Sequence, residues 1–284
     1  MLAAIFWLML NRIMMTDHPP RPASLAETDL TTDYIFDQAV QLRQPVSGYR
    51  FGTDAVFLAA SVPAGKGRLL DMGAGAGAVS LGVSWRLPDY HITAVEKDPY
   101  LAALLASNIE ANGRAERIRA LEADITSLPP VLAGSFDQLV ANPPFHQPGG
   151  TRPSDRRRAL AHQGDGPSLA DWVAAGLRAL KPKGRLSFIC RSDRADEVLA
   201  ALYGKAGEIV QFPLWPARAA PAIRTIISAR KGVAGGGALL AGMVLHNMDG
   251  SLTNEAQQVM KGQPIDLAHP GVPRPRAPAS TRPD

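Results

Sequence analysis

Residues 68–83 read Arg-Leu-Leu-Asp-Met-Gly-Ala-Gly-Ala-Gly-Ala-Val-Ser-Leu-Gly-Val. The first five form an apolar run typical of a buried strand, and the run that begins at Ala78 is typical of a helix. Gly73, Gly75 and Gly77 therefore lie in a turn from strand to helix. Glycines let a backbone approach a ligand closely, and the free N–H groups at the start of a helix favour a carboxylate or a phosphate. The stretch predicts a site for a nucleotide-type cofactor.

Short apolar runs alternate with longer segments of helical period on both sides of this stretch. That alternation predicts an α/β fold with a doubly wound, seven-stranded, mostly parallel sheet. Strands are expected at 68–72, 91–95, 118–121, 136–140, 185–190, 209–214 and 225–229, with helices at 99–112 and 169–180. Residues 39–44 lead through 45–48 into 49–51, which predicts a small N-terminal hairpin over the mouth of the site. Residues 239–260 are expected to add an accessory strand and helix.

The length of 284 residues and the 46% hydrophobic content suit one domain, expected at 33–262. We expect 1–32 to be a disordered or over-extended N-terminus, with Met14 or Met15 as the true initiator, and 263–284 to be a disordered Pro/Arg-rich tail. The apolar start is too short to span a bilayer, so no stable membrane association is expected, although a weak surface anchor is an alternative.

The cysteine content and the charge limit the chemistry of the protein. The chain has one cysteine, Cys190, which lies in an expected buried strand. A disulfide framework and a thiolate metal site are therefore excluded, and a reducing compartment, the cytoplasm, is expected. The net charge of +4 and the clustered arginines permit a polyanionic partner.

Three carboxylates follow predicted strands and suit a cofactor. Asp71 precedes the glycines, where it can face the amino-acid moiety of S-adenosylmethionine, whereas it would repel the pyrophosphate of a dinucleotide. Glu96 ends the second strand and can accept both ribose hydroxyls. Asp124 follows the third strand and can accept the adenine amine, although a helix or turn cap is its alternative role. Because the glycines also satisfy a dinucleotide fingerprint, Asp71 is the residue that favours S-adenosylmethionine.

Asn142-Pro-Pro-Phe145 comes directly after the fourth expected strand. An exocyclic amine on a heteroaromatic ring is a poor nucleophile because its lone pair is delocalised. If the Asn142 side-chain oxygen and the Pro143 carbonyl each accept an amine hydrogen, the lone pair can point at a sulfonium methyl group. Pro143 and Pro144 would stiffen the turn, and Phe145 would offer a face for stacking an extruded base. An ordinary turn is the alternative for this tetrapeptide.

These motifs resemble those of class I methyltransferases with an Asn-Pro-Pro-Phe/Tyr motif. More narrowly, they resemble the bacterial family that N6-methylates the adenine beside the anticodon of valine tRNA. The resemblance rests on Gln44-Pro-x-x-Gly48-Tyr-Arg-Phe-x-x-Asp54-Ala-Val-x-Leu-Ala59, Asp71-Met-Gly-x-Gly-x-Gly77, Asn142-Pro-Pro-Phe145, Arg157-x-x-x-Ala-His162 and Leu245-His-x-x-Asp249-Gly-x-x-Thr253-x-Glu255. It implies cofactor contacts at Asp71, Gly73, Glu96 and Asp124, and amine recognition by Asn142 and Pro143.

Two stretches are expected to contact RNA. Tyr49, Arg50 and Phe51 combine stacking surfaces with a cation, as a single-stranded anticodon loop requires, although packing under the hairpin is an equal alternative. The basic segment after the tetrapeptide is expected to contact phosphate through Arg152, Arg156, Arg157 and Arg158, with a solvated loop as its alternative. The partner is therefore expected to be tRNA, bound by a monomer.

Other enzymes share parts of this pattern. Ribosomal-RNA guanine-N2 methyltransferases also extend the motif with Phe145-His146, but they usually carry a second, degenerate domain that this chain lacks. Protein glutamine-N5 methyltransferases usually have Tyr at position 145 and a helical N-terminal domain. Asp71 disfavours a dinucleotide-dependent oxidoreductase, and the intact tetrapeptide disfavours a non-catalytic binding module.

Overall fold

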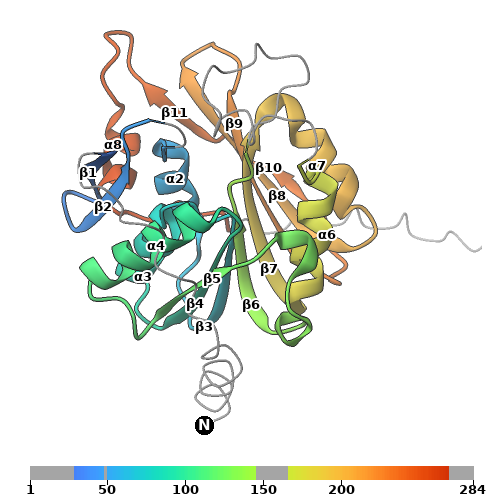
Figure 1. The fold of residues 1–284 in the computed structure, drawn as a ribbon. Helices are drawn as coiled ribbons and strands as arrows, with labels where there is room; N and C mark the ends of the chain where they lie inside the picture. The colour runs from blue at the N-terminus through green and yellow to red at the C-terminus, as the bar shows by residue number, and fades with distance from the viewer. Residues whose placement is uncertain (1–28, 48–49, 145–165, 269–284) are drawn as a thin grey trace, which may run out of the picture.

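The computed structural model describes residues 29–47, 50–144 and 166–268, and its centre is a nine-stranded sheet (Figure 1). The strands follow the order β10-β8-β9-β7-β6-β3-β4-β5, and β11 pairs with β8. Their bounds are β3 Gly67–Met72, β4 Tyr90–Glu96, β5 Ile118–Glu122, β6 Phe136–Ala141, β7 Leu180–Arg191, β8 Ala206–Ala217, β9 Arg224–Lys231, β10 Ala238–Leu239 and β11 Met243–His246. Only β9 runs antiparallel to its neighbours among these strands. The predicted fold class and all seven predicted strands are confirmed.

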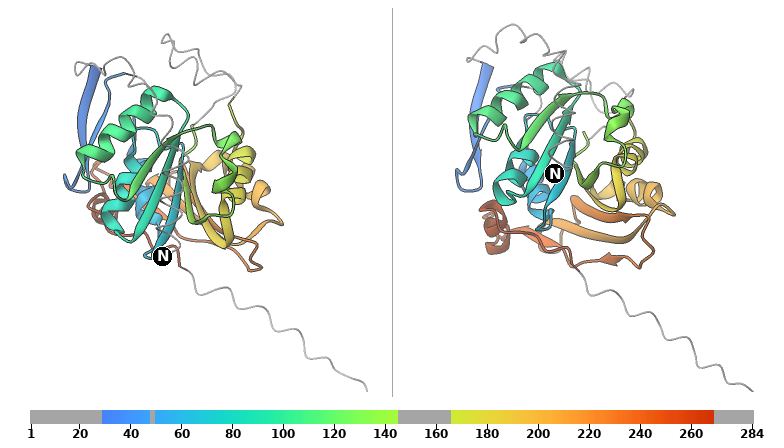
Figure 2. Two further views of the ribbon diagram at one scale, coloured as in Figure 1. Left: turned by 60° about the horizontal axis from the view of Figure 1, so that its bottom comes forward. Right: turned by 90° about the horizontal axis from the view of Figure 1, so that it is seen from below.

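Helices cover both faces of the sheet, as the doubly wound prediction requires (Figures 1 and 2). One face carries α2 (Thr53–Ser61), α3 (Ala78–Arg86), α4 (Pro99–Ala111) and α8 (Asn254–Met260), and the other carries α6 (Leu169–Ala179) and α7 (Ala195–Leu202). Short 3-10 turns are η2 (Ile125–Ser127), η3 (Pro130–Leu132) and η4 (Ser192–Arg194). Each face has its own cluster of buried apolar side chains, so the sheet separates two cores.

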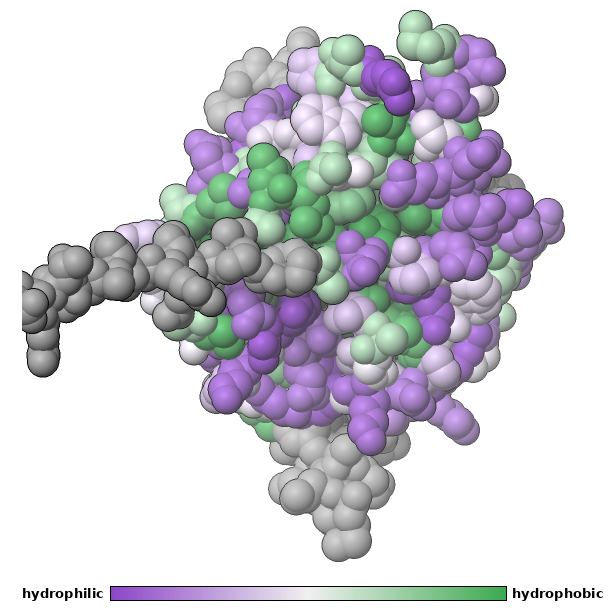
Figure 3. All heavy atoms as spheres, turned by 180° about the vertical axis from the view of Figure 1, so that it is seen from behind, coloured by the Kyte–Doolittle hydropathy of each residue, from purple (hydrophilic) through white to green (hydrophobic). Residues whose placement is uncertain are grey.

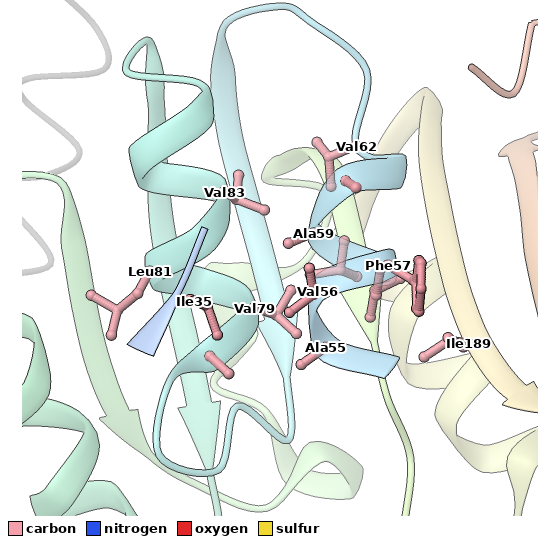
Figure 4. Close-up of a cluster of buried hydrophobic side chains, with 14 of the residues drawn as sticks. Ile35, Ala55, Val56, Phe57, Ala59, Val62, Val79, Leu81, Val83 and Ile189 are labelled. Atoms are coloured by element: carbon pink, nitrogen blue, oxygen red, sulfur yellow. The ribbon is translucent and has the colours of Figure 1, made fainter. Parts of the chain in front are cut away.

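Helix α2 is apolar on nearly all sides because it lies between the sheet and α3. Figure 4 shows Ala55 and Ala59 turned toward Val79 and Val83 of α3, while Phe57 approaches the sheet at Ile189. Small side chains bring the two helices close together.

Apolar residues also reach the surface seen from behind, where Figure 3 shows a green area bordered by hydrophilic residues.

Helix α4 confirms the expected helix at 99–112. Pro99 suits its first turn, where no intrahelical N–H partner is needed. The Asp98 carboxylate accepts hydrogen bonds from Tyr100 N at 2.8 Å and Leu101 N at 3.1 Å and so caps the start. The helix ends at its cap residue Asn112, next to Gly113, whose φ is +61°.

The N-terminal hairpin exists, and its strand at 40–45 confirms the one expected at 39–44, but the turn predicted at 45–48 and the second strand predicted at 49–51 were wrong. Strand β1 (Leu30–Ile35) pairs antiparallel with β2 (Val40–Pro45), so the turn is at 36–39 and residues 45–48 follow the hairpin. The turn contains no glycine or proline: Phe36, Asp37 and Gln38 all have φ between 52° and 69°. Sequence patterns for turns therefore missed it, because they depend on the residues that usually adopt positive φ.

The described chain continues past residue 262, the predicted end of the domain. Ile265 donates a backbone hydrogen bond to Ala60 O at 2.9 Å, and Ile265 and Leu267 are buried against the core. The described structure thus extends before residue 33, where β1 begins at Leu30, and beyond residue 262. The domain boundaries at 33 and 262 stay predictions. No helix among the described residues is long and apolar enough to cross a membrane.

Candidate functional site

The candidate site lies where the strand order reverses. Strand β3 has β4 and β5 on one side and β6 and β7 on the other, which is the position at which open parallel sheets bind ligands. Met72 at the end of β3 is paired with Ala141 at the end of β6. The glycine turn and Asn142, which come next in the two strands, therefore leave the same edge of the sheet side by side.

The glycine turn has the conformation that its residues predict. Gly73, Gly75 and Gly77 have φ of +69°, +55° and +100°, values that L side chains rarely adopt. A Cβ at Gly73 would lie 2.6 Å from Cη2 of Trp172 in α6, and one at Gly77 would lie 2.7 Å from Cδ1 of Leu105 in α4. Glycine at 73 and 77 is therefore required by both backbone conformation and packing.

Asp71 lies beneath the turn rather than at its open side. Its carboxylate is buried, and Oδ2 accepts a hydrogen bond from Ser80 Oγ at 2.6 Å. Burial raises the pKa of Asp71 to about 7, and the bonds from Ser80 oppose that rise. A direct contact between Asp71 and the cofactor stays a prediction. The structure shows that this carboxylate links the end of β3 to α3.

Glu96 faces the turn from the end of β4. Its Oε2 accepts a hydrogen bond from Gly75 N at 2.8 Å, and Oε1 accepts from Lys97 N at 2.8 Å and Asp98 N at 2.9 Å. Burial raises the pKa of Glu96, and the three backbone N–H groups oppose the rise. A carboxylate offers about four acceptor positions, so Glu96 retains capacity for a ribose hydroxyl.

Asp124 has the capping role that was its alternative. Its Oδ1 accepts hydrogen bonds from Thr126 N and Thr126 Oγ1, both at 2.8 Å, at the start of η2. Its Oδ2 lies 2.7 Å from Nζ of Lys97. Burial would raise the pKa of Asp124, but the bonds from Lys97 and Thr126 outweigh it and lower that pKa. Asp124 is thus an ionised group at the edge beside Glu96, and recognition of adenine by it stays a prediction.

Asn142 carries the most informative feature of the site. Its Oδ1 is buried and has no hydrogen-bond partner among the residues that the structure describes, which is uncommon for a buried polar atom. Pro143, the next residue, is buried, and Pro144 is exposed. An unpaired amide oxygen at this edge is an acceptor that is ready for an external N–H group. Phe145, the last residue of the predicted motif, lies outside the described residues.

The predicted RNA contacts are only partly within the described structure. Arg50 bonds to the hairpin: its guanidinium lies 2.9 Å from Asp33 Oδ2 and 2.7 Å from Thr31 Oγ1. Phe51 is partly buried against the core, which agrees with the packing alternative. Tyr49, Arg152, Arg156, Arg157 and Arg158 lie outside the described residues.

Three residues of the site were not predicted from sequence. Ser80 binds Asp71, Trp172 packs against Gly73, and Asn108 donates to Ala76 O at 2.9 Å within the glycine turn. Asn108 is fully buried. A polar residue on the apolar face of the helix 99–112 was a signal that could have identified it, because buried amides require specific partners.

Two surface grooves lie elsewhere on the molecule. One of about 500 Å³ is formed by α7, β8 and β10, and one of about 320 Å³ by the hairpin turn and α8. Neither includes a residue predicted to bind cofactor or amine. Within the described ranges, no group of three or more His, Cys, Asp and Glu side chains could hold a metal ion.

Residues 49–211 match the methyltransferase small domain family. A tRNA1(Val) (adenine(37)-N6)-methyltransferase from Porphyromonas gingivalis is 30% identical over 200 residues, which cover 68% of this chain and 77% of the relative. The enzyme of the same description from Aeromonas hydrophila is 34% identical over 53% of this chain and 63% of its own length. The chain belongs to the methyltransferase small domain family. The predicted class of enzyme, a methyltransferase dependent on S-adenosylmethionine, is therefore confirmed.

Solved structures show the same fold as this methyltransferase. A predicted O-methyltransferase from Agrobacterium tumefaciens superimposes with a TM-score of 0.63 at 24% identity, covering 75% of this chain and 98% of that one. TYW2 from P. horikoshii, in complex with MeSAdo, superimposes with a TM-score of 0.50 at 16% identity, covering 72% of each chain.

The residues of this methyltransferase fit its cofactor, S-adenosylmethionine. A turn of three glycines provides close backbone approach, and Glu96 is a partly buried acceptor beside it. Assignment of individual contacts to Asp71, Gly73, Gly75, Gly77, Glu96 and Asp124 remains a proposal.

Proposed function

We propose that this methyltransferase transfers the methyl group of S-adenosylmethionine to the N6 amine of an adenine in the anticodon loop of tRNA. The observation that carries the proposal is the buried, unpartnered Oδ1 of Asn142, adjacent to the glycine turn at the carboxyl edge of the sheet. An acceptor in that place suits a group that brings its own N–H, as an exocyclic amine does.

The reaction requires little proton transfer chemistry from the protein. The cofactor supplies an electrophilic methyl carbon on a sulfonium. Asn142 Oδ1 and the Pro143 carbonyl would each accept one hydrogen of the amine and orient its lone pair toward that carbon. The N–C bond forms as the C–S bond breaks, and the amine nitrogen then loses one proton to water. Neither acceptor is a strong base, and none is needed: the positive charge would pass from sulfur to the amine nitrogen as the N–C bond forms, and the N–H group that this charge makes acidic would lose its proton to water.

The choice of adenine in tRNA follows from the relatives. Those from Porphyromonas gingivalis and Aeromonas hydrophila are both described as tRNA1(Val) (adenine(37)-N6)-methyltransferases. The family match over residues 49–211 includes the glycine turn and Asn142, the parts that carry the chemistry. We propose the same nucleotide as substrate here.

The remaining proposals concern the setting of the reaction. We propose that Tyr49, Phe51 and the arginine-rich segment 152–158 contact the RNA, with Phe145 stacking on the base. We propose that the protein acts in the cytoplasm as a monomer of one domain.

The decisive experiment is transfer of radiolabelled methyl groups from S-adenosylmethionine to bulk tRNA, rRNA and protein, followed by nucleoside and amino-acid analysis. Label in N6-methyladenosine from tRNA is expected. A valine tRNA transcript with adenine 37 replaced by guanine is the matched control and should remain unlabelled. Label confined to N2-methylguanosine from rRNA, or to glutamine in protein, would overturn the proposal.

A further inference from the structure

Asn108 of α4 and Asn112, the cap residue at the end of α4, hold the N-terminal hairpin through its backbone. Asn108 Oδ1 accepts a hydrogen bond from Arg43 N at 3.0 Å, and its Nδ2 donates to Arg43 O at 2.8 Å. Asn112 makes the same pair of bonds with Gln41, at 3.0 and 2.7 Å. The spacing explains the match: four residues of a helix rise about 6 Å, and two residues of a strand span about 6.8 Å. The two amides act as a neighbouring strand for the free edge of β2.

The third hydrogen bond of Asn108 goes to a different part of the protein from the third hydrogen bond of Asn112. The second Nδ2 hydrogen of Asn112 goes to Asn108 O in its own helix, at 2.7 Å. The second Nδ2 hydrogen of Asn108 goes to Ala76 O in the glycine turn, at 2.9 Å. Asn108 therefore connects the hairpin, α4 and the cofactor turn through one fully buried side chain.

The bond to Ala76 O fixes a peptide that could otherwise rotate. Gly75 and Gly77 flank Ala76, and both have positive φ. Because glycine adopts either sign of φ at low cost, the peptide between Ala76 and Gly77 has two accessible orientations. In the observed one, Ala76 O accepts from Asn108 and Gly77 N donates to Ala74 O at 2.9 Å. Without the amide of Asn108, Ala76 O would be buried and unpaired.

We propose that Asn108 is a positioning residue that sets the orientation of the Ala76–Gly77 peptide, and thereby prepares the glycine turn for S-adenosylmethionine. It does not touch the reacting atoms. The cofactor would bind one arrangement of the turn, so its apparent dissociation constant rises as the population of that arrangement falls. The hairpin holds the Asn108 side chain in place through its two hydrogen bonds with the backbone of Arg43.

Paired substitutions separate this role from a purely structural one. Asn108→Ala and Asn112→Ala each remove two bonds to the hairpin, so both should lower Tm, and Asn108→Ala should lower it more because its side chain is fully buried and also pairs Ala76 O. Only Asn108→Ala should raise the Kd for S-adenosylhomocysteine, by about tenfold, since one unpaired buried carbonyl is worth about that factor. The Kd of Asn112→Ala should stay within about twofold of the unmodified protein.

Hydrogen–deuterium exchange on the free protein provides a readout that needs no cofactor. The backbone amides of residues 75–77 should exchange faster in Asn108→Ala than in the unmodified protein. Their exchange rates should be unchanged in Asn112→Ala. Should Asn108→Ala not fold, Asn108→Asp keeps the acceptor for Arg43 N, and Asn112→Asp becomes its control. Equal Kd changes in the two variants, or unchanged exchange at 75–77, would overturn the proposal. RNA takes no part in these measurements, so their outcome is independent of the proposed substrate.

Discussion

Replacement of Asn142 by alanine should make the protein more stable and inactive at the same time. Within the described part of the chain, the buried Oδ1 atom of Asn142 has no partner, and such an acceptor costs about 1–3 kcal/mol in the folded state. Alanine removes that cost but also removes some packing. We expect the free energy of unfolding to rise by about 1 kcal/mol, which for a domain of this size raises Tm by about 2–4 °C. The gain arises because the native site keeps an acceptor unpaired for its substrate.

Turnover should fall in the same variant by about 100-fold, the usual effect of removing one preorganised polar group from a reaction centre. The Kd for S-adenosylhomocysteine should be unchanged. Differential scanning calorimetry, binding titration and single-turnover methyl transfer measure the three quantities. Asn112→Ala is the control, because all three hydrogen bonds of that side chain are satisfied and its loss should lower Tm. A lower Tm for Asn142→Ala together with preserved turnover would refute the assignment of Oδ1 as the amine acceptor.

Three further substitutions test the cofactor edge. Burial raises the pKa of Asp71 to about 7 from 3.8, so this group stabilises the fold below about pH 4 and that stability is lost as pH rises to about 7. Relative to Asp71→Asn, the unmodified protein should therefore lose about 4 kcal/mol across this interval in denaturant unfolding, and parallel pH profiles would contradict the buried acid. Gly73→Ala should lower the free energy of unfolding by about 2 kcal/mol, because the φ of residue 73 is positive and the added Cβ would meet Trp172. Combining it with Trp172→Phe should restore part of this loss in denaturant unfolding. If the double variant is no more stable than Gly73→Ala, the loss comes from the backbone alone. Glu96→Ala should weaken S-adenosylhomocysteine binding by about tenfold or more before it affects the turnover of bound cofactor, and an unchanged Kd would remove Glu96 from the cofactor site.

Local patterns in the sequence were sufficient for the order of elements. The apolar run 68–72, the three glycines and the helical run after them predicted β3, the turn and α3, because strand period, glycine conformation and helix period are all local properties. The helical spacing of the apolar residues in 99–112 predicted α4 for the same reason. The position of Asn142 after a strand was equally readable, and parallel strands then place it beside the glycine turn.

Tertiary structure decided which polar groups are paired and which are not. Asn108 and Arg43 lie 65 positions apart in the chain, and no pattern within either segment predicts that they bond. The hairpin turn at Phe36, Asp37 and Gln38 contains no glycine or proline, so its place depends on packing of β2 against α4. The unpartnered Oδ1 of Asn142 is visible only once every neighbour is in place. Hydrogen-bond satisfaction is a property of the whole folded chain, whereas conformational preference belongs to a few consecutive residues.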